Sequence, residues 1–221
     1  MNNIALINAS PKKSQSVSEI LLDELKTLLP LTSEEYSIKE HHINTACITD
    51  DVINELQSCT TWIFAFPLYV DAVPSHLLSC LRQIERYGNS DKVINVYAIV
   101  NCGLYEGKQA QNALAIMENW CIRCIKSNKA NLKWRTGIGF GGGGALPSMK
   151  KTPLGRGAKT DLGKAYAAFV KAVLSHTSAD NTYISINIPR FLYKLVAEIR
   201  WVKMIKANGG KKADLGKRLN H

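Results

Sequence analysis

A run of small hydroxyl and basic residues near the start of the chain has the composition of an anion-binding loop. It reads Asn8-Ala-Ser-Pro-Lys-Lys-Ser-Gln-Ser16 and follows the apolar residues 4–7. A helical pattern comes next, so the loop would offer main-chain N–H groups at the positive end of a helix dipole. Lys12 and Lys13 add positive charge. These features predict a phosphate-binding loop.

The same residues also fit a plain helix N-terminus. Ser16 and Glu19 have the S-x-x-E spacing of a capping box. In this motif the serine and glutamate side chains each accept a hydrogen bond from the other residue's main-chain N–H group. Serine-rich helix starts are common because the hydroxyl satisfies an N–H group that the helix leaves unpaired. Taken alone, the run therefore leaves both interpretations open.

The composition is that of a soluble globular protein. The chain has 221 residues, of which 46% are hydrophobic and 21% are charged. This length allows one domain with a sizeable core, with room for an appendage. The chain lacks an apolar stretch long enough for an ordinary spanning helix and a secretory signal pattern at its N-terminus. We therefore expect a cytoplasmic location.

The positive charge of the chain is concentrated near its C-terminus. The formal net charge is +10, and the residues from Arg190 onward, with nine basic and two acidic side chains, contribute +7 of it. Such charge could attract nucleic acid, an anionic membrane or phosphate-bearing ligands. The sequence lacks the interleaved aromatic and basic residues of a nucleic-acid-binding platform. We therefore expect no nucleic-acid partner.

Five predicted strands alternate with helices along the chain. Parallel neighbours require helical crossovers, so this order predicts an α/β fold with a doubly wound five-stranded parallel sheet and helices on both faces. The predicted strands are residues 2–8, 34–43, 61–66, 93–100 and 132–140. The predicted helices are residues 20–29, 50–56, a segment starting at Ser75, residues 109–125 and a segment spanning Leu162 to Val173.

Three loops rich in polar residues, glycine and proline follow three of these strands. They are residues 8–16, 67–74 and 101–107. In doubly wound sheets, ligands bind outside the carboxyl ends of the strands, where the strand order reverses. We therefore expect the three loops to meet at one edge of the sheet and form a ligand site.

Together the three loops resemble a known family. Ser10-Pro-Lys-Lys-x-x-Ser16 is similar to the phosphate loop of flavodoxin-like NAD(P)H-dependent FMN reductases and quinone reductases, in which Ser-Pro-Arg is common. Phe66-Pro-Leu-Tyr69 with Pro74, and Asn101-x-Gly-x-Tyr-Glu-Gly107, resemble the second and third loops. The resemblance covers residues 2–176. Lys12 replaces the usual arginine, and Val17 stands where threonine or serine is frequent.

The resemblance implies an FMN-dependent enzyme. Hydride would pass from NAD(P)H through FMN to a quinone, azo, nitro or flavin acceptor. Because the flavin does this chemistry, no catalytic side chain is implied. The family also implies a homodimer and a small-molecule acceptor. The alternative is a non-catalytic flavodoxin-like electron carrier or partner-binding module. The implied FMN-binding residues are Ser10, Lys12, Ser16, Val17, Pro67, Leu68, Tyr69, Val70, Asn101, Gly103, Tyr105 and Glu106.

The C-terminal part predicts a separate basic helix. We expect residues 1–180 to form a flavodoxin-like FMN-binding domain and residues 181–221 to form a basic helical appendage. Pro189 fits a helix start and Gly209-Gly210 fits its end. Apolar residues 191, 195, 199 and 202 share one stripe. The helix could cover the domain, pack on a second subunit, or lie on an anionic membrane; packing against protein is the simplest of the three.

Three further motifs suggest chemistry that their positions disfavour. Cys121 and Cys124 lie within a predicted helix, whereas a thioredoxin-type pair would stand at a helix start, so we expect buried thiols. The glycines at 137, 139 and 142 match a dinucleotide fingerprint, but they follow the last predicted strand. We expect them to admit a ring or a neighbouring subunit. His41-His42 lacks the spacing of a metal site.

Overall fold

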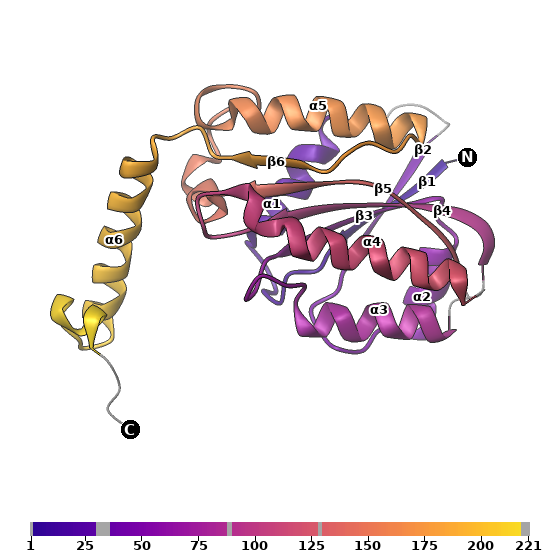
Figure 1. The fold of residues 1–221 in the computed structure, drawn as a ribbon, viewed down its shortest axis with the longest axis horizontal. Coiled ribbons are helices and arrows are strands. Elements are labelled where there is room, and N and C mark those ends of the chain that lie inside the picture. The colour runs from indigo at the N-terminus through magenta and orange to yellow at the C-terminus, as the bar shows by residue number, and fades with distance from the viewer. Residues whose placement is uncertain (1, 30–35, 88–89, 128–129, 218–221) are drawn as a thin grey trace. The chain divides into compact units, whose positions relative to one another are not determined.

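The computed structural model of the protein describes residues 2–29, 36–87, 90–127 and 130–217. The chain divides into two compact units, Met1–Asn187 and Ile188–His221. The first unit contains the sheet and the three candidate loops (Figure 1). The second unit contains a helix and a short 3-10 helix.

A parallel sheet forms the centre of the first unit. Within the described residues it has six strands in the order β2-β1-β3-β4-β5-β6, and every neighbouring pair is parallel. The strands are β1 (Asn2–Asn8), β2 (Tyr36–His42), β3 (Thr61–Pro67), β4 (Ser90–Asn101), β5 (Ala130–Gly141) and β6 (Thr182–Ser185). Residues 34 and 35 of the predicted second strand lie outside the described residues.

The prediction of five strands was wrong, because the structure has a sixth. β6 pairs with β5 through residues 138–141 at the edge of the sheet. It is only four residues long and none of its residues is fully buried, so it lacks the apolar run that identified the other strands. Residues 181–187, which the sequence interpretation assigned to the appendage, therefore include a strand of the first unit.

In the described part of the first unit, five α-helices connect the strands. They are α1 (Val17–Lys26), α2 (Asp50–Gln57), α3 (Ser75–Tyr87), α4 (Gln111–Lys126) and α5 (Thr160–Ser175). Thr49 caps α2, because its side chain accepts a hydrogen bond from the N–H group of Val52. The segment before α4 is a 3-10 helix, η1 (Gly107–Ala110). Two further 3-10 helices, η2 (Gly143–Met149) and η3 (Gly157–Lys159), precede α5.

The helices cover both faces of the sheet, because successive strand residues point to opposite sides. Figure 1 shows α3 and α4 on one face and α5 on the other. On the α3–α4 face, the ring of Trp62 stacks on that of Trp120, with the centroids 6.5 Å apart. On the other face, the Tyr97 hydroxyl donates to the Ala172 carbonyl at 2.9 Å. Each buried aromatic or aliphatic side chain contributes roughly 1.5–3 kcal/mol.

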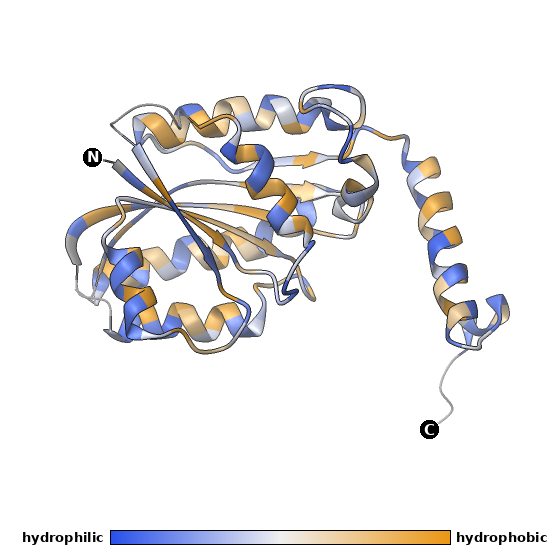
Figure 2. Ribbon diagram, turned by 180° about the vertical axis from the view of Figure 1, so that it is seen from behind, coloured by the Kyte–Doolittle hydropathy of each residue, from blue (hydrophilic) through white to orange (hydrophobic). Residues whose placement is uncertain are grey.

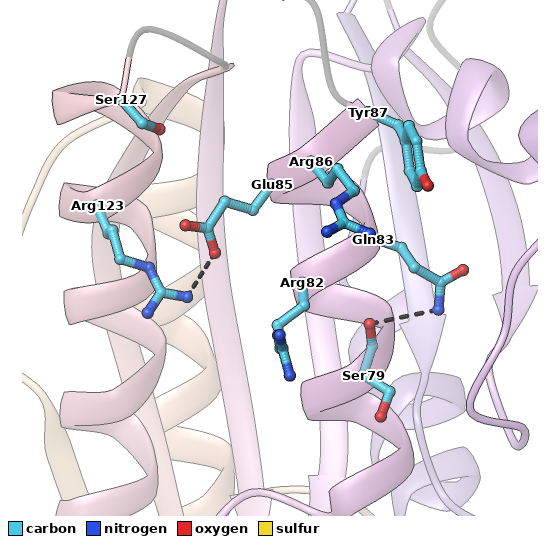
Figure 3. A pocket seen from close by; sticks show the side chains of 8 residues that line it. All are labelled: Ser79, Arg82, Gln83, Glu85, Arg86, Tyr87, Arg123 and Ser127. Carbon is cyan, nitrogen blue, oxygen red and sulfur yellow. Dashed lines mark hydrogen bonds and ion pairs between the residues drawn. The ribbon is translucent and has the colours of Figure 1, made fainter.

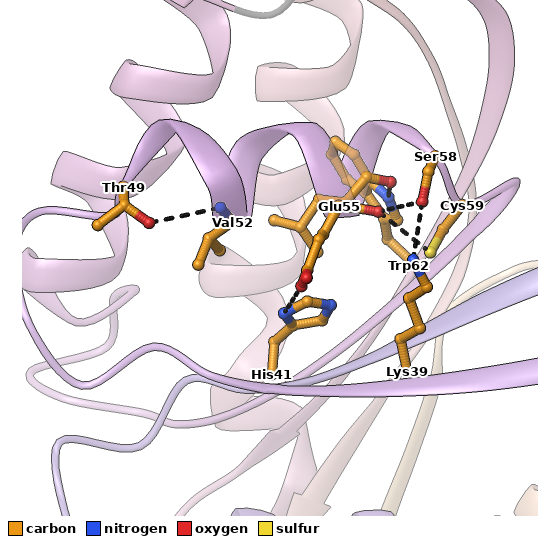
Figure 4. Close-up of polar contacts among 9 residues, drawn as sticks. Lys39, His41, Thr49, Val52, Glu55, Ser58, Cys59 and Trp62 are labelled. Carbon is orange, nitrogen blue, oxygen red and sulfur yellow. Dashed lines mark hydrogen bonds and ion pairs between the residues drawn. The ribbon is translucent and has the colours of Figure 1, made fainter.

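Polar contacts hold the edge strand β2 against α2 (Figure 4). Nδ1 of His41 lies 3.8 Å from Oε2 of Glu55. Lys39 donates to the hydroxyl of Ser58 at 3.2 Å. Burial lowers the pKa of His41, although the nearby Glu55 carboxylate partly opposes this shift. Within the described residues, no group of three or more His, Cys, Asp or Glu side chains could hold a metal ion.

The second unit is built around α6 (Arg190–Ala207), followed by the 3-10 helix η4 (Lys212–Gly216). Pro189 is the residue just before the helix, and Gly209 adopts a left-handed conformation just after it, with φ of +79°. The N–H group of Gly210 then donates to the Ile205 carbonyl at 2.9 Å, which is typical of a helix C-terminus. Among the described residues, no helix has the length and apolarity needed to cross a membrane.

Candidate functional site

The loop after β1 turns back on itself through side-chain contacts. The N–H group of Ser10 donates to Oδ1 of Asn8 at 3.1 Å, and that of Lys12 donates to the hydroxyl of Ser10 at 3.3 Å. The carbonyl of Ser10 also lies 3.1 Å from Nε2 of His42 on the neighbouring strand β2. Ser10 is buried, whereas Lys12 is exposed. The loop is thus fixed at its first residues and presents Lys12 to solvent.

The predicted capping box is present at the start of α1. The hydroxyl of Ser16 accepts from the N–H group of Glu19 at 3.0 Å, and Glu19 Oε2 accepts from the N–H group of Ser16 at 3.2 Å. Asn8 also donates to the Ser16 hydroxyl, at 3.4 Å. Ser16 is buried. The cap interpretation is therefore confirmed, and Ser16 stabilises the helix start whether or not the loop binds a ligand.

Several main-chain donors of this loop remain available to an anion. Within the described residues, the structure shows no hydrogen bond for the N–H groups of the five residues Lys13, Ser14, Gln15, Val17 and Ser18. Gln15 has a positive φ of 54°. A left-handed residue within a run of N–H groups is a feature of main-chain anion nests. The loop therefore offers both donors and the dipole of α1 to a phosphate group.

The loop after β3 forms a tight turn with exposed apolar side chains. Tyr69 and Ala72 exchange two main-chain hydrogen bonds, at 3.0 and 3.1 Å. Val70 and Asp71 between them both have positive φ, at 48° and 57°. Val70 is 98% exposed and Tyr69 is 47% exposed. Pro67 ends β3, and Leu68 follows it in a half-buried position.

Asn101, the last residue of β4, joins the start of α1, the end of β3 and the loop after β3. Its side-chain Nδ2 donates to the hydroxyl of Ser18 on α1 at 2.9 Å and to the carbonyl of Phe66 on β3 at 3.1 Å. Its main-chain carbonyl accepts from the N–H group of Leu68 at 2.7 Å. Asn101 is buried. Since β1, β3 and β4 are parallel, the three loops that follow them lie at one edge of the sheet, as expected, and Asn101 links the second and third loops to α1.

The loop after β4 is held by Cys102. The thiol of Cys102 lies within hydrogen-bonding distance of the carbonyls of Leu104 (3.5 Å) and Glu106 (3.6 Å). Burial raises the pKa of this thiol, which keeps it protonated and suits a structural role. A Cβ atom at Gly103 would meet no other atom within 4 Å, so open space adjoins this residue. Leu104 is 53% exposed.

The glycines of β5 have a different role from the one that the sequence suggested. A Cβ atom on Gly141 would lie 2.1 Å from the carbonyl oxygen of Tyr105, and one on Gly139 would lie 2.5 Å from that of Gly107. The glycines therefore allow the main chain of residues 105–107 to lie directly on β5. The expectation that they admit a ring or a second subunit is corrected: the close neighbour is the third loop of the same chain.

A fourth loop, which the sequence interpretation treated only as a glycine run that would admit a ring or a neighbouring subunit, also reaches this edge. The N–H group of Gly143 donates to the Cys102 carbonyl at 2.9 Å, and that of Gly142 donates to the Leu104 carbonyl. Gly143 also lies against Val17 and Asn101. The loop follows β5 just as the other three follow their strands, so its position after a strand was the available signal.

The two cysteines that were considered as a redox pair, Cys121 and Cys124, lie away from the site. Cys121 and Cys124 are buried within α4, and burial raises the pKa of both thiols, that of Cys124 to about 12. Neither is a reactive thiolate at neutral pH. The prediction of buried thiols in the middle of a helix is therefore confirmed.

An open groove of about 610 Å³ lies between α3 and α4, outside the meeting point of the loops (Figure 3). Arg86 and Arg123 stand in the last turns of these helices, where a positive charge is favoured by the helix dipole. Arg123 also forms an ion pair with Glu85 across the groove. Helix stability therefore accounts for Arg86 and Arg123 without a ligand.

The order of the five strands β2-β1-β3-β4-β5 is that of the flavodoxin-like fold, in which the ligand site lies where the order reverses between β1 and β3. The three loops meet at this point. The protein is thus a flavodoxin-like α/β protein with one additional edge strand, β6.

Comparison with solved structures supports this assignment of the fold. The chain is similar to Smu.1420 from Streptococcus mutans UA159 (TM-score 0.52, 11% identity, 77% of this chain and 100% of that chain). It is also similar to an NADPH-quinone reductase from P. pentosaceus (TM-score 0.50, 13% identity, 77% of this chain and 98% of that chain). A third similar structure is the Trp repressor binding protein from Bacillus subtilis (TM-score 0.51, 12% identity, 80% of this chain and 99% of that chain). No family model and no curated protein sequence matches the chain.

The resemblance to flavodoxin-like NAD(P)H reductases, stated above from three short loops, is therefore confirmed at the level of the fold. The sequence identities of 11–13% to these three structures are too low to transfer a substrate or a binding residue. The twelve predicted FMN-binding residues consequently stay a prediction, although the structure brings the loops that carry them to one edge of the sheet.

Proposed function

We propose that the protein is an FMN-dependent NAD(P)H oxidoreductase that passes hydride to a quinone, azo, nitro or flavin acceptor. One observation carries the proposal: Asn101 joins the first turn of α1, which directly follows the proposed phosphate loop, to the two loops with exposed apolar residues. Main-chain N–H groups that can bind a phosphate, next to exposed apolar side chains, suit a ligand with a phosphate group and a flat aromatic ring. FMN is such a ligand, and it supplies the hydride-transfer chemistry when it is bound.

The residues of the first loop fit a phosphate. The unpaired N–H groups at 13–15, 17 and 18 would donate to its oxygens, and Lys12 would add charge. Ser10 and Ser16 are buried, and both already accept hydrogen bonds within the loop. We therefore propose that these two serines contribute mainly by shaping the loop, and that the main chain and Lys12 make most of the phosphate contacts.

The residues of the other loops fit a ring. Pro67, Leu68, Tyr69 and Val70 would lie along one side, and Asn101, Gly103, Tyr105 and Glu106 would close the other. Tyr69, Val70 and Leu104 supply exposed apolar area, and the open space beside Gly103 leaves room for a close approach. Val17, at the first position of α1, would place its N–H group at the phosphate.

The first experiment is a titration of the purified full chain with FMN, followed by flavin fluorescence. We expect saturable binding that Lys12→Gln weakens roughly tenfold, as for loss of a charge-assisted contact. Lys92→Gln is the matched control, because Lys92 is exposed at the opposite end of β4. A protein that is purified without flavin and does not take up FMN would disprove the proposal.

The second experiment separates an enzyme from an electron carrier. Oxidation of NADH and NADPH is followed with 2-methyl-1,4-naphthoquinone as acceptor and then with an azo dye, a nitroarene and free flavin. We expect acceptor-dependent turnover only with bound FMN. Tight FMN binding without turnover for any acceptor would favour the carrier alternative. Light scattering of the purified chain tests the homodimer that we propose from the family resemblance.

A further inference from the structure

We propose that α6 binds the surface of an anionic lipid membrane. This inference concerns the second unit and does not depend on the proposed flavin chemistry. It starts from the apolar residues of α6, none of which is buried. Exposed apolar side chains on one short helix mark a surface that binds a partner. The large exposed residues are Phe191, Leu192, Leu195, Val196, Ile199, Trp201 and Met204.

The second unit cannot bury this helix by itself. The only other element of its described part is η4, which is five residues long. Figure 2 shows hydrophobic and hydrophilic residues alternating along α6. Phe191, Leu195 and Ile199 are four residues apart and therefore share one face, while Trp201 lies on another part of the circumference. Together with Leu192 and Val196, those three residues make one broad apolar face, wider than a narrow stripe, that a flat surface can cover.

Charge decides among the possible partners. The residues from Arg190 onward carry a formal charge of +7, and the rest of the chain carries the remaining +3 of the total of +10. A second copy of α6 would bring two strongly positive helices together, and the first unit does not offer a compensating net negative charge. An anionic lipid surface attracts basic residues and accepts apolar ones. It therefore matches both properties of α6.

The arrangement of side chains fits a helix that lies in the membrane interface. Lys194, Lys203 and Lys206 have long apolar stems, so they can reach the headgroups while neighbouring apolar residues enter the acyl region. α6 falls short of the apolarity of a spanning helix. We therefore place it on the membrane surface rather than across the membrane.

The test is co-sedimentation of the full chain with vesicles. One set contains phosphatidylcholine with about one third phosphatidylglycerol, and the other contains phosphatidylcholine alone. We expect at least about tenfold stronger partitioning to the anionic vesicles at low salt, and a loss of most of it at high salt. Failure to bind the anionic vesicles at low salt would overturn the proposal.

Variants locate the binding surface. Arg200→Gln, Lys203→Gln and Lys206→Gln together should abolish the preference for anionic vesicles. The matched control removes three exposed lysines of the first unit, with Lys92→Gln, Lys133→Gln and Lys171→Gln, and should retain binding. Leu195→Asp with Ile199→Asp should also prevent binding, and circular dichroism checks that the chain stays folded. If the α6 triple variant and its control lost vesicle binding equally, a specific role for α6 would be contradicted.

Tryptophan fluorescence provides a readout of which face of α6 enters the lipid. Because Trp201 lies away from the face that carries Leu195 and Ile199, brominated lipid should quench the tryptophan of a Leu195→Trp, Trp201→Phe protein more strongly than Trp201 of the wild type. Trp62 and Trp120 are buried and Trp134 is half-buried, and these three contribute equally to both proteins. Light scattering tests the other possible partner, a second copy of the chain. Self-association that Leu195→Asp disrupts, in a protein that does not bind anionic vesicles, would assign α6 to a second copy of the chain and overturn the membrane proposal.

Discussion

Lys159, just before α5, forms a buried ion pair with Glu24 of α1. Lys159 is 1% exposed, and the carboxylate of Glu24 has one buried oxygen without a hydrogen-bond partner among the described residues. The pair joins two helices on the same face of the sheet, 135 residues apart in the chain. α1 starts directly after the proposed phosphate loop, so an ion pair that holds α1 in place also helps to fix the position of that loop.

We expect Lys159→Met to lower the free energy of unfolding by about 3 kcal/mol, because it leaves the Glu24 carboxylate buried without its counter-charge. Removing both charges, with Lys159→Met and Glu24→Met, should restore stability to within about 1 kcal/mol of the wild type. Urea denaturation measures both. Lys164→Met is the control, since Lys164 forms an exposed ion pair with Asp161 and its loss should cost little. Equal effects at 159 and 164 would contradict this account.

The turn after β3 is strained at Val70. A β-branched residue with φ of 48° is unfavourable by roughly 1–2 kcal/mol, and two successive positive-φ residues form a turn that prefers Asn-Gly. Since Val70 is 98% exposed, its side chain gains little from packing. We therefore expect Val70→Asn to raise the free energy of unfolding by about 1 kcal/mol.

The same variant tests the role of the turn in the site. If Val70 lies along the flavin ring as proposed, Val70→Asn should weaken FMN binding while it stabilises the fold. Thermal unfolding and FMN titration on one preparation give both values. Val93→Asn, at an exposed position of β4, is the comparison, because it alters an exposed valine without removing a positive φ. A destabilised Val70→Asn protein would show that the turn is not strained.

Two histidines make stability depend on pH. Burial lowers the pKa of His41 and of His176 below the usual value of 6.5, and the Arg135 charge lowers that of His176 further. A depressed folded-state pKa means that the unfolded chain binds more protons below pH 6.5, so stability is present above that pH and is lost as the pH falls. We expect a lower free energy of unfolding at about pH 5.5 than at about pH 7.5.

His176→Asn should reduce this dependence. In the wild type Nδ1 of His176 lies 3.2 Å from Nδ2 of Asn95, so it accepts a hydrogen bond that protonation would remove. Asparagine tolerates the left-handed φ of 52° at this position. Urea denaturation of both proteins across the same pH range is the measurement. An unchanged slope in the variant would show that His176 does not contribute.

The contact between β5 and the third loop should be sensitive to a single methyl group. We expect Gly141→Ala to cost more than about 2 kcal/mol or to displace the loop, because the new Cβ atom would meet the main chain of Tyr105 and Gly107. Gly103→Ala should be tolerated by the fold, since its Cβ atom would meet open space. Thermal unfolding measures both. A stable Gly141→Ala protein with unaltered FMN binding would contradict the close packing.

The central strands could be predicted because their apolar runs need no tertiary information. β1 and β3, buried on both faces, were predicted to within one residue at their ends. β6 has no such run, and its pairing with β5 depends on the path of the chain after α5. η1 replaces the predicted first turn of α4 because Gly107 packs between β5 and β6. The periodicity of apolar residues along the helix gives no information on this contact with distant strands.

The site was predicted in part for the same reason. The three loops were found because each follows a strand, which is a property of the order of elements along the chain. The role of Asn101 as a joint between α1, β3 and β4 depends on three hydrogen bonds to residues distant in sequence, so residue type alone did not distinguish it from a ligand contact. The glycines at the end of β5 were expected to admit a ring or a neighbouring subunit, because their contact with the main chain of the third loop depends on the fold and not on their spacing.

The two edges of the sheet, within the described part of the chain, have a consequence for solubility. At one edge β6 is only four residues long, and at the other β2 carries Lys39, Glu40, His41 and His42. Short or charged edge strands are poor templates for another strand. Sheet-to-sheet aggregation is therefore discouraged on both sides, and the protein should remain dispersed at concentrations where an apolar edge would begin fibril growth.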